Sequence, residues 1–209
     1  MNSYSSIYLA SQSPRRQELL KQIGVDVQML LPDASEDSEG IETPLPHEKA
    51  RPYVERVTLA KSAAALTRWK RRNLPWAPIL CADTTVSLPN HPDGDILGKP
   101  QNAADAYRIL SLLNGKTHEV LTAVAVRITE NEEPLCLVQI STVHFATLSI
   151  AQITAYIASG EPFGKAGAYG IQGLGGTLIS SITGSYSGIM GLPVYETSQL
   201  LDRANVIRK

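Results

Sequence analysis

Two arginines fall where a helix least favours cations, in the segment LASQSPRRQELL near the start of the chain. Ser13 is suited to cap this helix and the proline after it to the first helical position, so Arg15 and Arg16 lie in the first turn. The unpaired backbone N–H groups already make that end of a helix positive. The placement is explained if loop 11–16 binds an anion such as phosphate, and two solvated arginines are the alternative.

One carboxylate interrupts an apolar strand pattern in the segment ILCADTTVSL. Because side chains alternate along a strand, Asp83 shares a partly polar face with Cys81, Thr85 and Ser87. Such a carboxylate could ligate a metal or act as a base that activates water. A structural aspartate bonded to nearby backbone N–H groups is the alternative.

Further charged residues form a set that suits a polyphosphate and its metal. Lys61 lies in the alanine-rich helix segment LAKSAAAL, and Lys99 follows a glycine in ILGKP. Glu36 and Asp37 could complete a magnesium or manganese site with Asp83, because hard cations prefer carboxylate and phosphate oxygens. Taken singly, the lysines are interpreted as solvated surface residues, and the two acids as part of a solvated loop.

A glycine-rich segment, GKAGAYGIQGLGG, occupies residues 164–176. Its six glycines indicate close backbone approach to a ligand or tight loop packing. The chain contains no P-loop motif. Gln172 carries an amide donor beside an acceptor, and this pair matches the O4 acceptor and N3–H donor of uracil or thymine.

The basic segment RWKRR, residues 68–72, is interpreted as a solvated helix end, where cations suit the helix dipole. Nucleic-acid binding by cations with a neighbouring aromatic is the alternative, but a net charge of −1 argues against a broadly basic surface. Cys81, Cys136 and the four histidines show no metal-ligand spacing. We therefore expect two free thiols and no zinc site.

Strand and helix patterns alternate along the chain and must position these residues. Strands are expected at 7–10, 79–88, 120–126, 135–145 and 177–182. Helices are expected at 13–24, 52–72, 102–115, 149–160 and 195–201. Asn102 and the capping box of Ser149 with Gln152 mark two helix starts, and 33–46 and 89–94 are interpreted as loop and turn. The pattern predicts an α/β fold with a mixed sheet.

Composition bounds the class of protein. At 209 residues with 43% hydrophobic side chains, the chain can build one sizeable core, so residues 1–209 are expected to form a single domain. No signal-peptide pattern and no apolar run long enough to span a membrane occurs. We therefore expect a cytoplasmic protein that works without a membrane or nucleic-acid partner.

Seven segments, taken in order, resemble the Maf family of nucleoside triphosphate pyrophosphatases. They are LASQSPRRQELL, the helix around Lys61, CADTTV, ILGKP, NGKTHEVLTAVAV, KAGAYGIQGLGG and GSYSGIMGLP. The resemblance implies an elongated mixed sheet in two lobes around a nucleotide cleft, related in fold to inosine triphosphate pyrophosphatases. It also implies cleavage between the α and β phosphates with a divalent cation, Mg²⁺ or Mn²⁺.

The resemblance also implies roles for individual residues. Asp83 is the implied catalytic acidic residue, with Glu36 helping to hold the metal. The implied phosphate-side ligands, of which the two lysines also serve catalysis, are Ser11, Arg15, Arg16, Lys61 and Lys99. Three features resemble the branch of the family that acts on dTTP and UTP: the segment AYGIQG, which contains Gln172, Thr84 after the aspartate, and the arginine pair. We expect a dTTP and UTP pyrophosphatase that removes non-standard pyrimidine nucleotides, with a homodimer as the candidate assembly; a non-hydrolysing nucleotide-binding regulator of cell division is the alternative.

Overall fold

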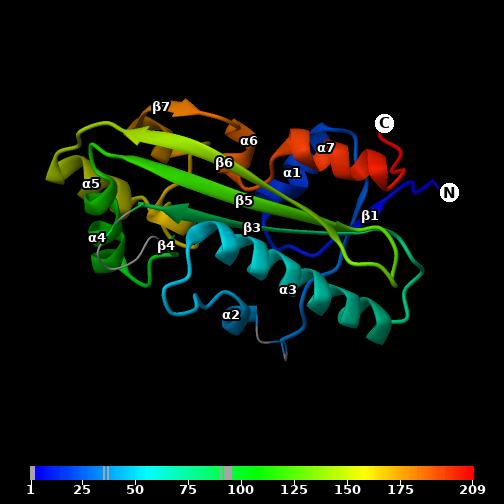
Figure 1. The fold of residues 1–209 in the computed structure, drawn as a ribbon. Helices are drawn as coiled ribbons and strands as arrows, with labels where there is room; N and C mark the ends of the chain where they lie inside the picture. The colour runs from blue at the N-terminus through cyan, green and yellow to red at the C-terminus, as the bar shows by residue number, and fades with distance from the viewer. Residues whose placement is uncertain (1–2, 35, 37, 90, 92–95) are drawn as a thin grey trace.

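A long mixed β-sheet runs through the centre of the computed structural model (Figure 1), which describes residues 3–34, 36, 38–89, 91 and 96–209. The strands are β1 (Ile7–Leu9), β2 (Val27–Met29), β3 (Ile79–Ser87), β4 (Ile96–Leu97), β5 (Thr117–Arg127), β6 (Leu135–Phe145) and β7 (Ile179–Thr183). They lie in the order β2-β1-β3-β5-β6-β7, with β4 paired to β3. Strand β1 is parallel to β2 and β3, and the remaining pairs are antiparallel, which confirms the predicted mixed sheet.

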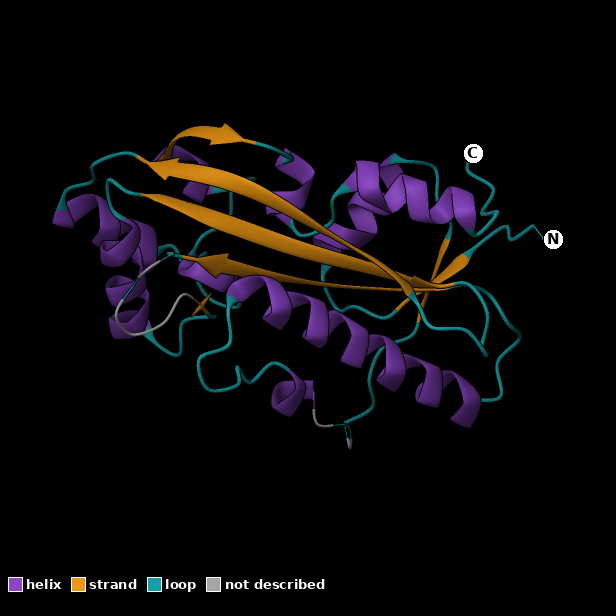
Figure 2. Ribbon diagram, in the orientation of Figure 1, coloured by secondary structure: helices purple, strands orange, loops and turns teal. Residues whose placement is uncertain are grey.

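Helices cover both faces and one end of this sheet (Figure 2). They are α1 (Pro14–Gln22), α2 (Ser38–Ile41), α3 (Ala50–Arg71), α4 (Ala103–Leu113), α5 (Ile150–Ala158), α6 (Tyr186–Met190) and α7 (Val194–Arg203), with short 3₁₀ turns η1 (Ala166–Ala168) and η2 (Leu174–Leu178). Helix α3 packs along β3 and β5 on one face, and α1, α6 and α7 lie on the other. Helices α4 and α5 pack together at one end.

Two apolar clusters share the long central strands and make the two lobes. Val86 and Val120 belong to a cluster with α4 and α5. Leu80 and Val124, further along the same strands, belong to a cluster with α1 and α7. Because β3 and β5 run through both clusters, the part of these two strands that lies between the clusters is held rigidly from both ends.

The predicted strands and helices are present, and the differences are short elements. Strand β2, strand β4, helix α2 and helix α6 were not expected, and α2 lies inside the predicted loop 33–46. Elements this short carry no readable period, so tertiary contacts decide them. Asn102 and Ser149 cap their helices as predicted, whereas Ser13 occupies its N-cap position without a side-chain cap bond.

Some sequence expectations concern residues outside the described part of the chain. Asp37, the second predicted acid of the metal site, is one of these, as is most of the predicted turn 89–94. Among the helices of the described ranges, none has both the length and the apolar character required to cross a membrane.

Candidate active site

A cleft of about 680 Å³ opens between the two lobes, beside the middle of β3. This volume lies within the range of small-molecule sites. Its described lining carries twice as many cationic as acidic side chains: Arg15, Arg16, Lys61, Arg68, Arg71 and Lys99 against Glu36, Glu42 and Asp83. The excess of positive charge favours an anionic ligand.

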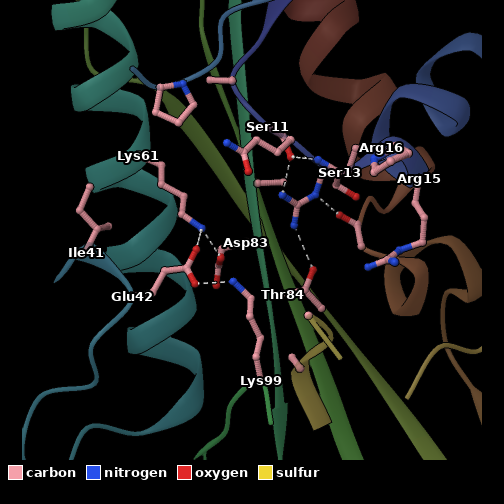
Figure 3. A pocket seen from close by; sticks show the side chains of 18 of the residues that line it. Ser11, Ser13, Arg15, Arg16, Ile41, Glu42, Lys61, Asp83, Thr84 and Lys99 are labelled. Atoms are coloured by element: carbon pink, nitrogen blue, oxygen red, sulfur yellow. Dashed lines mark hydrogen bonds and ion pairs between the residues drawn. The ribbon is translucent and has the colours of Figure 1, made fainter. Parts of the chain in front are cut away.

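Two lysines and two carboxylates meet on one side of the cleft (Figure 3). Lys61 of α3 donates to Oδ1 of Asp83 on β3 at 2.6 Å and to Oε1 of Glu42 at 2.7 Å. Lys99, just after β4, donates to Oε2 of Glu42 at 2.6 Å. The structure therefore brings Asp83, Lys61 and Lys99 together, as the sequence predicted, and adds Glu42.

Glu42 is a site residue that the sequence analysis missed. Burial opposes its ionisation, but the charges and hydrogen bonds of Lys61 and Lys99 outweigh this and lower the pKa of Glu42 to about 2. Glu42 follows α2 in the acidic segment in which Glu36 was chosen. No spacing or composition distinguishes the two acids, so sequence signal alone could not have selected Glu42.

The arginines lie on the other side of the cleft and reach across to α6 (Figure 3). Arg15 donates to the carbonyl of Met190 at 3.2 Å, and Arg16 donates to the carbonyl of Gly191 at 2.8 Å. These carbonyls end α6, where helices favour cations. The arginines stand at the start of α1 because they bind the end of another helix, and they also line the cleft.

Two hydroxyl residues complete the arginine side. The Oγ of Ser11 accepts hydrogen bonds from Arg16 at 3.0 Å and from the backbone N–H of Ser13 at 3.2 Å. Arg16 also donates to Oγ1 of Thr84 at 3.4 Å, and that hydroxyl lies 2.9 Å from Oγ1 of Thr122 on β5. Burial lowers the pKa of Arg16, and nearby Asp83 acts in the opposite direction. An arginine stays charged under these conditions, so the cation remains available to an anion.

Glu36 lies against α3 rather than beside Lys61. Arg68 donates to its Oε1 from Nε at 3.0 Å, and Arg71 donates to the same oxygen at 2.8 Å. The hydrogen bond from Arg68 is the main cause that lowers the pKa of Glu36 to about 2. Although Glu36 lines the cleft, its carboxylate is already paired.

The interpretation of residues 68–72 as a solvated helix end holds for Lys70 and Arg71, which are exposed, but is wrong for Arg68. Arg68 is only 5% exposed and also donates to the carbonyl of Leu30 at 2.8 Å. Arg71 and Arg72 both form ion pairs with Asp33. The cations do suit the end of α3, but the segment that follows β2 folds over them. Sequence pattern cannot show that a distant acidic segment packs there.

The glycine-rich segment borders the cleft through Gly164, Ala166 and Tyr169. Gly167 has a φ of +69°, and a Cβ there would lie 2.6 Å from the side chain of Val86, so tight packing accounts for this glycine. The Tyr169 hydroxyl lies 2.8 Å from Nε2 of His118, whose pKa burial lowers to about 4. The tight-packing alternative therefore explains part of this segment.

Gln172 is not brought into the cleft. Its side chain is exposed, in the turn between η1 and η2, and it is not among the residues that line the cavity. Thr84, the other residue assigned to the pyrimidine branch, does line the cavity beside Asp83. The structure thus brings together all the predicted phosphate-side residues, and leaves Gln172 apart.

The carboxylates of Glu42 and Asp83 fit a divalent cation in composition. Both converge on one ammonium group, that of Lys61. In the described part of the chain, no group of three acidic, histidine or cysteine side chains is arranged to hold a metal alone. Mg²⁺ commonly binds through one or two carboxylates and the substrate's phosphate oxygens, so this pair suits a cation that enters with a nucleotide.

Comparison with known proteins identifies the family. The family model described as Maf-like protein matches residues 6–204. A "dTTP/UTP pyrophosphatase" of Ralstonia nicotianae is 54% identical over 200 residues, covering 96% of this chain and 94% of that protein. One of the same name from Albidiferax ferrireducens is 56% identical over 196 residues, covering 93% and 94%.

Among solved structures, the Staphylococcus aureus Ham1 protein matches 68% of this chain and 72% of its own at a TM-score of 0.43 and 17% identity. That likeness is too low to support an argument. The family match and the high identity to its relatives decide the matter: the chain belongs to the Maf family.

Proposed function

We propose that the chain is a nucleoside triphosphate pyrophosphatase that hydrolyses dTTP and UTP to the nucleoside monophosphate and pyrophosphate. The observation that carries this proposal is the convergence of Asp83, Lys61, Glu42 and Lys99 in a cation-rich cleft. The relatives named for this activity match over nearly the full chain, which supports the same substrates here. Removal of non-standard pyrimidine nucleotides is the cellular role that we propose.

Asp83 acts as the base in the proposed mechanism. Lys61 holds Oδ1 of this carboxylate, and within the described residues no hydrogen bond reaches Oδ2. Oδ2 takes a proton from a water, whose oxygen forms a bond to the α-phosphorus as the bond from that phosphorus to the α–β bridging oxygen breaks. Pyrophosphate leaves with the bridging oxygen, and Lys99 and Lys61 offset the charge that develops on it.

The arginine side binds and orients the triphosphate. Arg15 and Arg16 each carry a planar guanidinium that suits phosphate oxygens, and Ser11 and Thr84 fix the position of Arg16. Glu42 and Asp83 are the residues that we propose hold a divalent cation, Mg²⁺ or Mn²⁺. When bound, such a cation neutralises phosphate charge and polarises the reacting phosphoryl group.

Incubation of the purified chain with dTTP and Mg²⁺ tests this function. We expect dTMP and pyrophosphate in equal amounts, with UTP cleaved likewise. Formation of dTDP and phosphate would contradict the stated bond cleavage. Tight dTTP binding without turnover would instead support the non-hydrolysing regulator of cell division, which the names of the relatives do not favour.

The cytoplasm is the compartment that we propose, because both cysteines are unpaired and nucleoside triphosphates are its metabolites. The homodimer stays a prediction as well. Cell fractionation and light scattering of the purified chain check these two points.

A further inference from the structure

The segment that carries Glu42 is attached to the first turns of α3. Three consecutive carbonyls in this segment accept hydrogen bonds from that helix. Tyr53 donates from its hydroxyl to the carbonyl of Glu42 at 2.7 Å. Arg56 donates to the carbonyl of Thr43 at 3.1 Å and to that of Ile41 at 3.5 Å. The backbone on both sides of Glu42 is therefore held by two side chains of one helix.

Arg56 is itself held in place. Its Nε and Nη2 donate to the two carboxylate oxygens of Glu48, each at 2.7 Å, and its guanidinium lies 5.6 Å from the ring centre of Tyr53. Glu48 also accepts a hydrogen bond from the backbone of Leu45 at 2.9 Å. A bidentate pair of this kind fixes the plane of the guanidinium, so its remaining donor directions toward the carbonyls are set.

The same helix also carries the lysine that Glu42 contacts. Lys61 lies further along α3, and α3 packs against β3, from which Asp83 projects. One rigid element thus sets the positions of Lys61 and, through Tyr53 and Arg56, of the backbone at Glu42.

We propose that Tyr53 and Arg56 are positioning residues for the reaction, which fix Glu42 where its carboxylate meets Lys99 and Lys61, the lysine that also holds Asp83. This inference rests on the proposed function and deepens it. The competing interpretation is that the two residues only stabilise the fold. The two interpretations predict different results. If Tyr53 and Arg56 are positioning residues, their substitution lowers kcat through Glu42. If they only stabilise the fold, their substitution lowers the melting temperature without an effect that depends on Glu42.

The first test compares Arg56→Ala with Arg51→Ala, since Arg51 is an exposed arginine of the same helix. We expect Arg56→Ala to lower kcat for dTTP about 10- to 100-fold, with KM changed less than about threefold, because misplaced groups cost turnover. Tyr53→Phe removes one hydrogen bond and should lower kcat about three- to tenfold. Arg56→Lys cannot reproduce the planar fork and should fall between Arg56→Ala and wild type. Wild-type kcat in Arg56→Ala would overturn the proposal.

A double-mutant cycle with Glu42→Gln separates the two interpretations. If Arg56 acts through Glu42, adding Arg56→Ala to the Glu42→Gln chain should change kcat less than about twofold. A loss in that background as large as in the wild-type background would show that Arg56 acts independently of Glu42, and would overturn the proposal.

Hydrogen exchange gives a readout that does not need turnover. We expect amides in segment 41–48 to exchange at least about tenfold faster in Arg56→Ala than in Arg51→Ala, at a temperature where both remain folded. Unchanged exchange would overturn the proposed attachment. A wild-type chain inactive on dTTP and UTP would refute the proposed function and the catalytic part of this inference, while the exchange result would still decide whether Arg56 holds the segment.

Discussion

The two sides of the cleft hold their cations in different ways. On one side, Lys61 and Lys99 are paired with the carboxylates of Asp83 and Glu42. On the other side, the arginines at the start of α1 bind neutral groups, namely backbone carbonyls and hydroxyls. The lysine side is close to electrically balanced, and the arginine side keeps its positive charge.

This difference predicts that one side of the cleft mainly binds the substrate and the other mainly catalyses its hydrolysis. Uncompensated charge draws in a polyanion and binds it, so the arginine side should dominate affinity. The ammonium group of Lys61 orients the Asp83 carboxylate, so the lysine side should dominate turnover. Substitutions on the two sides should therefore affect different kinetic constants, and the predictions below test that separation from the largest effect to the smallest.

Asp83→Asn should produce the largest effect. The amide is nearly isosteric and still accepts a hydrogen bond from Lys61, but it is a poor base and a poor metal ligand. We expect kcat for dTTP to fall roughly 10²- to 10⁴-fold, with the Kd for a non-hydrolysable analogue changed by no more than about threefold. Steady-state kinetics and calorimetry measure the two constants, and a variant as active as wild type would make Asp83 a structural residue.

Arg16→Ala should act mainly on affinity. Loss of a charge-assisted contact to phosphate is expected to weaken triphosphate binding about 10- to 50-fold at low salt. The difference from wild type should shrink at high salt, where ionic contacts are screened. Arg208→Ala is the control, because Arg208 pairs with Asp202 on α7, and neither residue lines the cleft.

Arg15→Ala and the double variant complete that experiment. If neither single variant nor the pair changes binding, the arginines serve only to tie α1 to the end of α6. A loss of kcat without a loss of affinity would contradict the proposed division between the two sides.

Glu42→Gln should change how the stability of the protein depends on pH, because it removes one of the two carboxylates that balance the lysines. The pKa of Glu42 is lowered from 4.5 to about 2, so folding favours its ionised form. Its contribution to stability is complete above pH 4.5 and is lost as the pH falls through 2. We expect the free energy of unfolding of the wild type to exceed that of Glu42→Gln by roughly 1–2 kcal/mol at pH 6, after allowance for partial solvent exposure. Near pH 2.5 the difference should be smaller.

Urea unfolding at several pH values measures that difference. Glu130→Gln is the control, because Glu130 is exposed and lies in the loop between β5 and β6. If the gap between wild type and Glu42→Gln stays constant from pH 6 to pH 2.5, the two lysines do not stabilise the Glu42 carboxylate as described.

Gln172→Ala should produce the smallest effect on kinetics, because Gln172 belongs to neither side of the cleft. Because its side chain is exposed and does not line the cleft, we expect the ratio of kcat/KM for dTTP to that for CTP to stay within about twofold of wild type. A selective loss of dTTP and UTP activity would instead support the base-reading role assigned to this amide from the sequence, and would require the turn to move towards the cleft.

Most of the regular structure was predictable because its signals are local. The caps at Asn102 and Ser149 and the long strands were placed correctly, since a cap bond or a period needs only a few neighbouring residues. The meeting of Asp83 with Lys61 and Lys99 was anticipated from residue types and from the family resemblance. The assignment of Glu36 to the metal came from the same reasoning, which missed Glu42 because this acidic segment has no pattern that distinguishes its acids.

The sequence by itself determined the alternation of strands and helices, the family, and the kinds of residue available for phosphate chemistry. Only the tertiary structure decided which of them meet. In the folded chain, Glu42 pairs with the lysines and Arg68 binds Glu36. Arg16 binds the end of α6, and Gln172 lies outside the cleft. The physical reason is range: helix and strand preferences arise within a few residues, whereas ion pairs form between segments whose separation in sequence gives no sign of their contact.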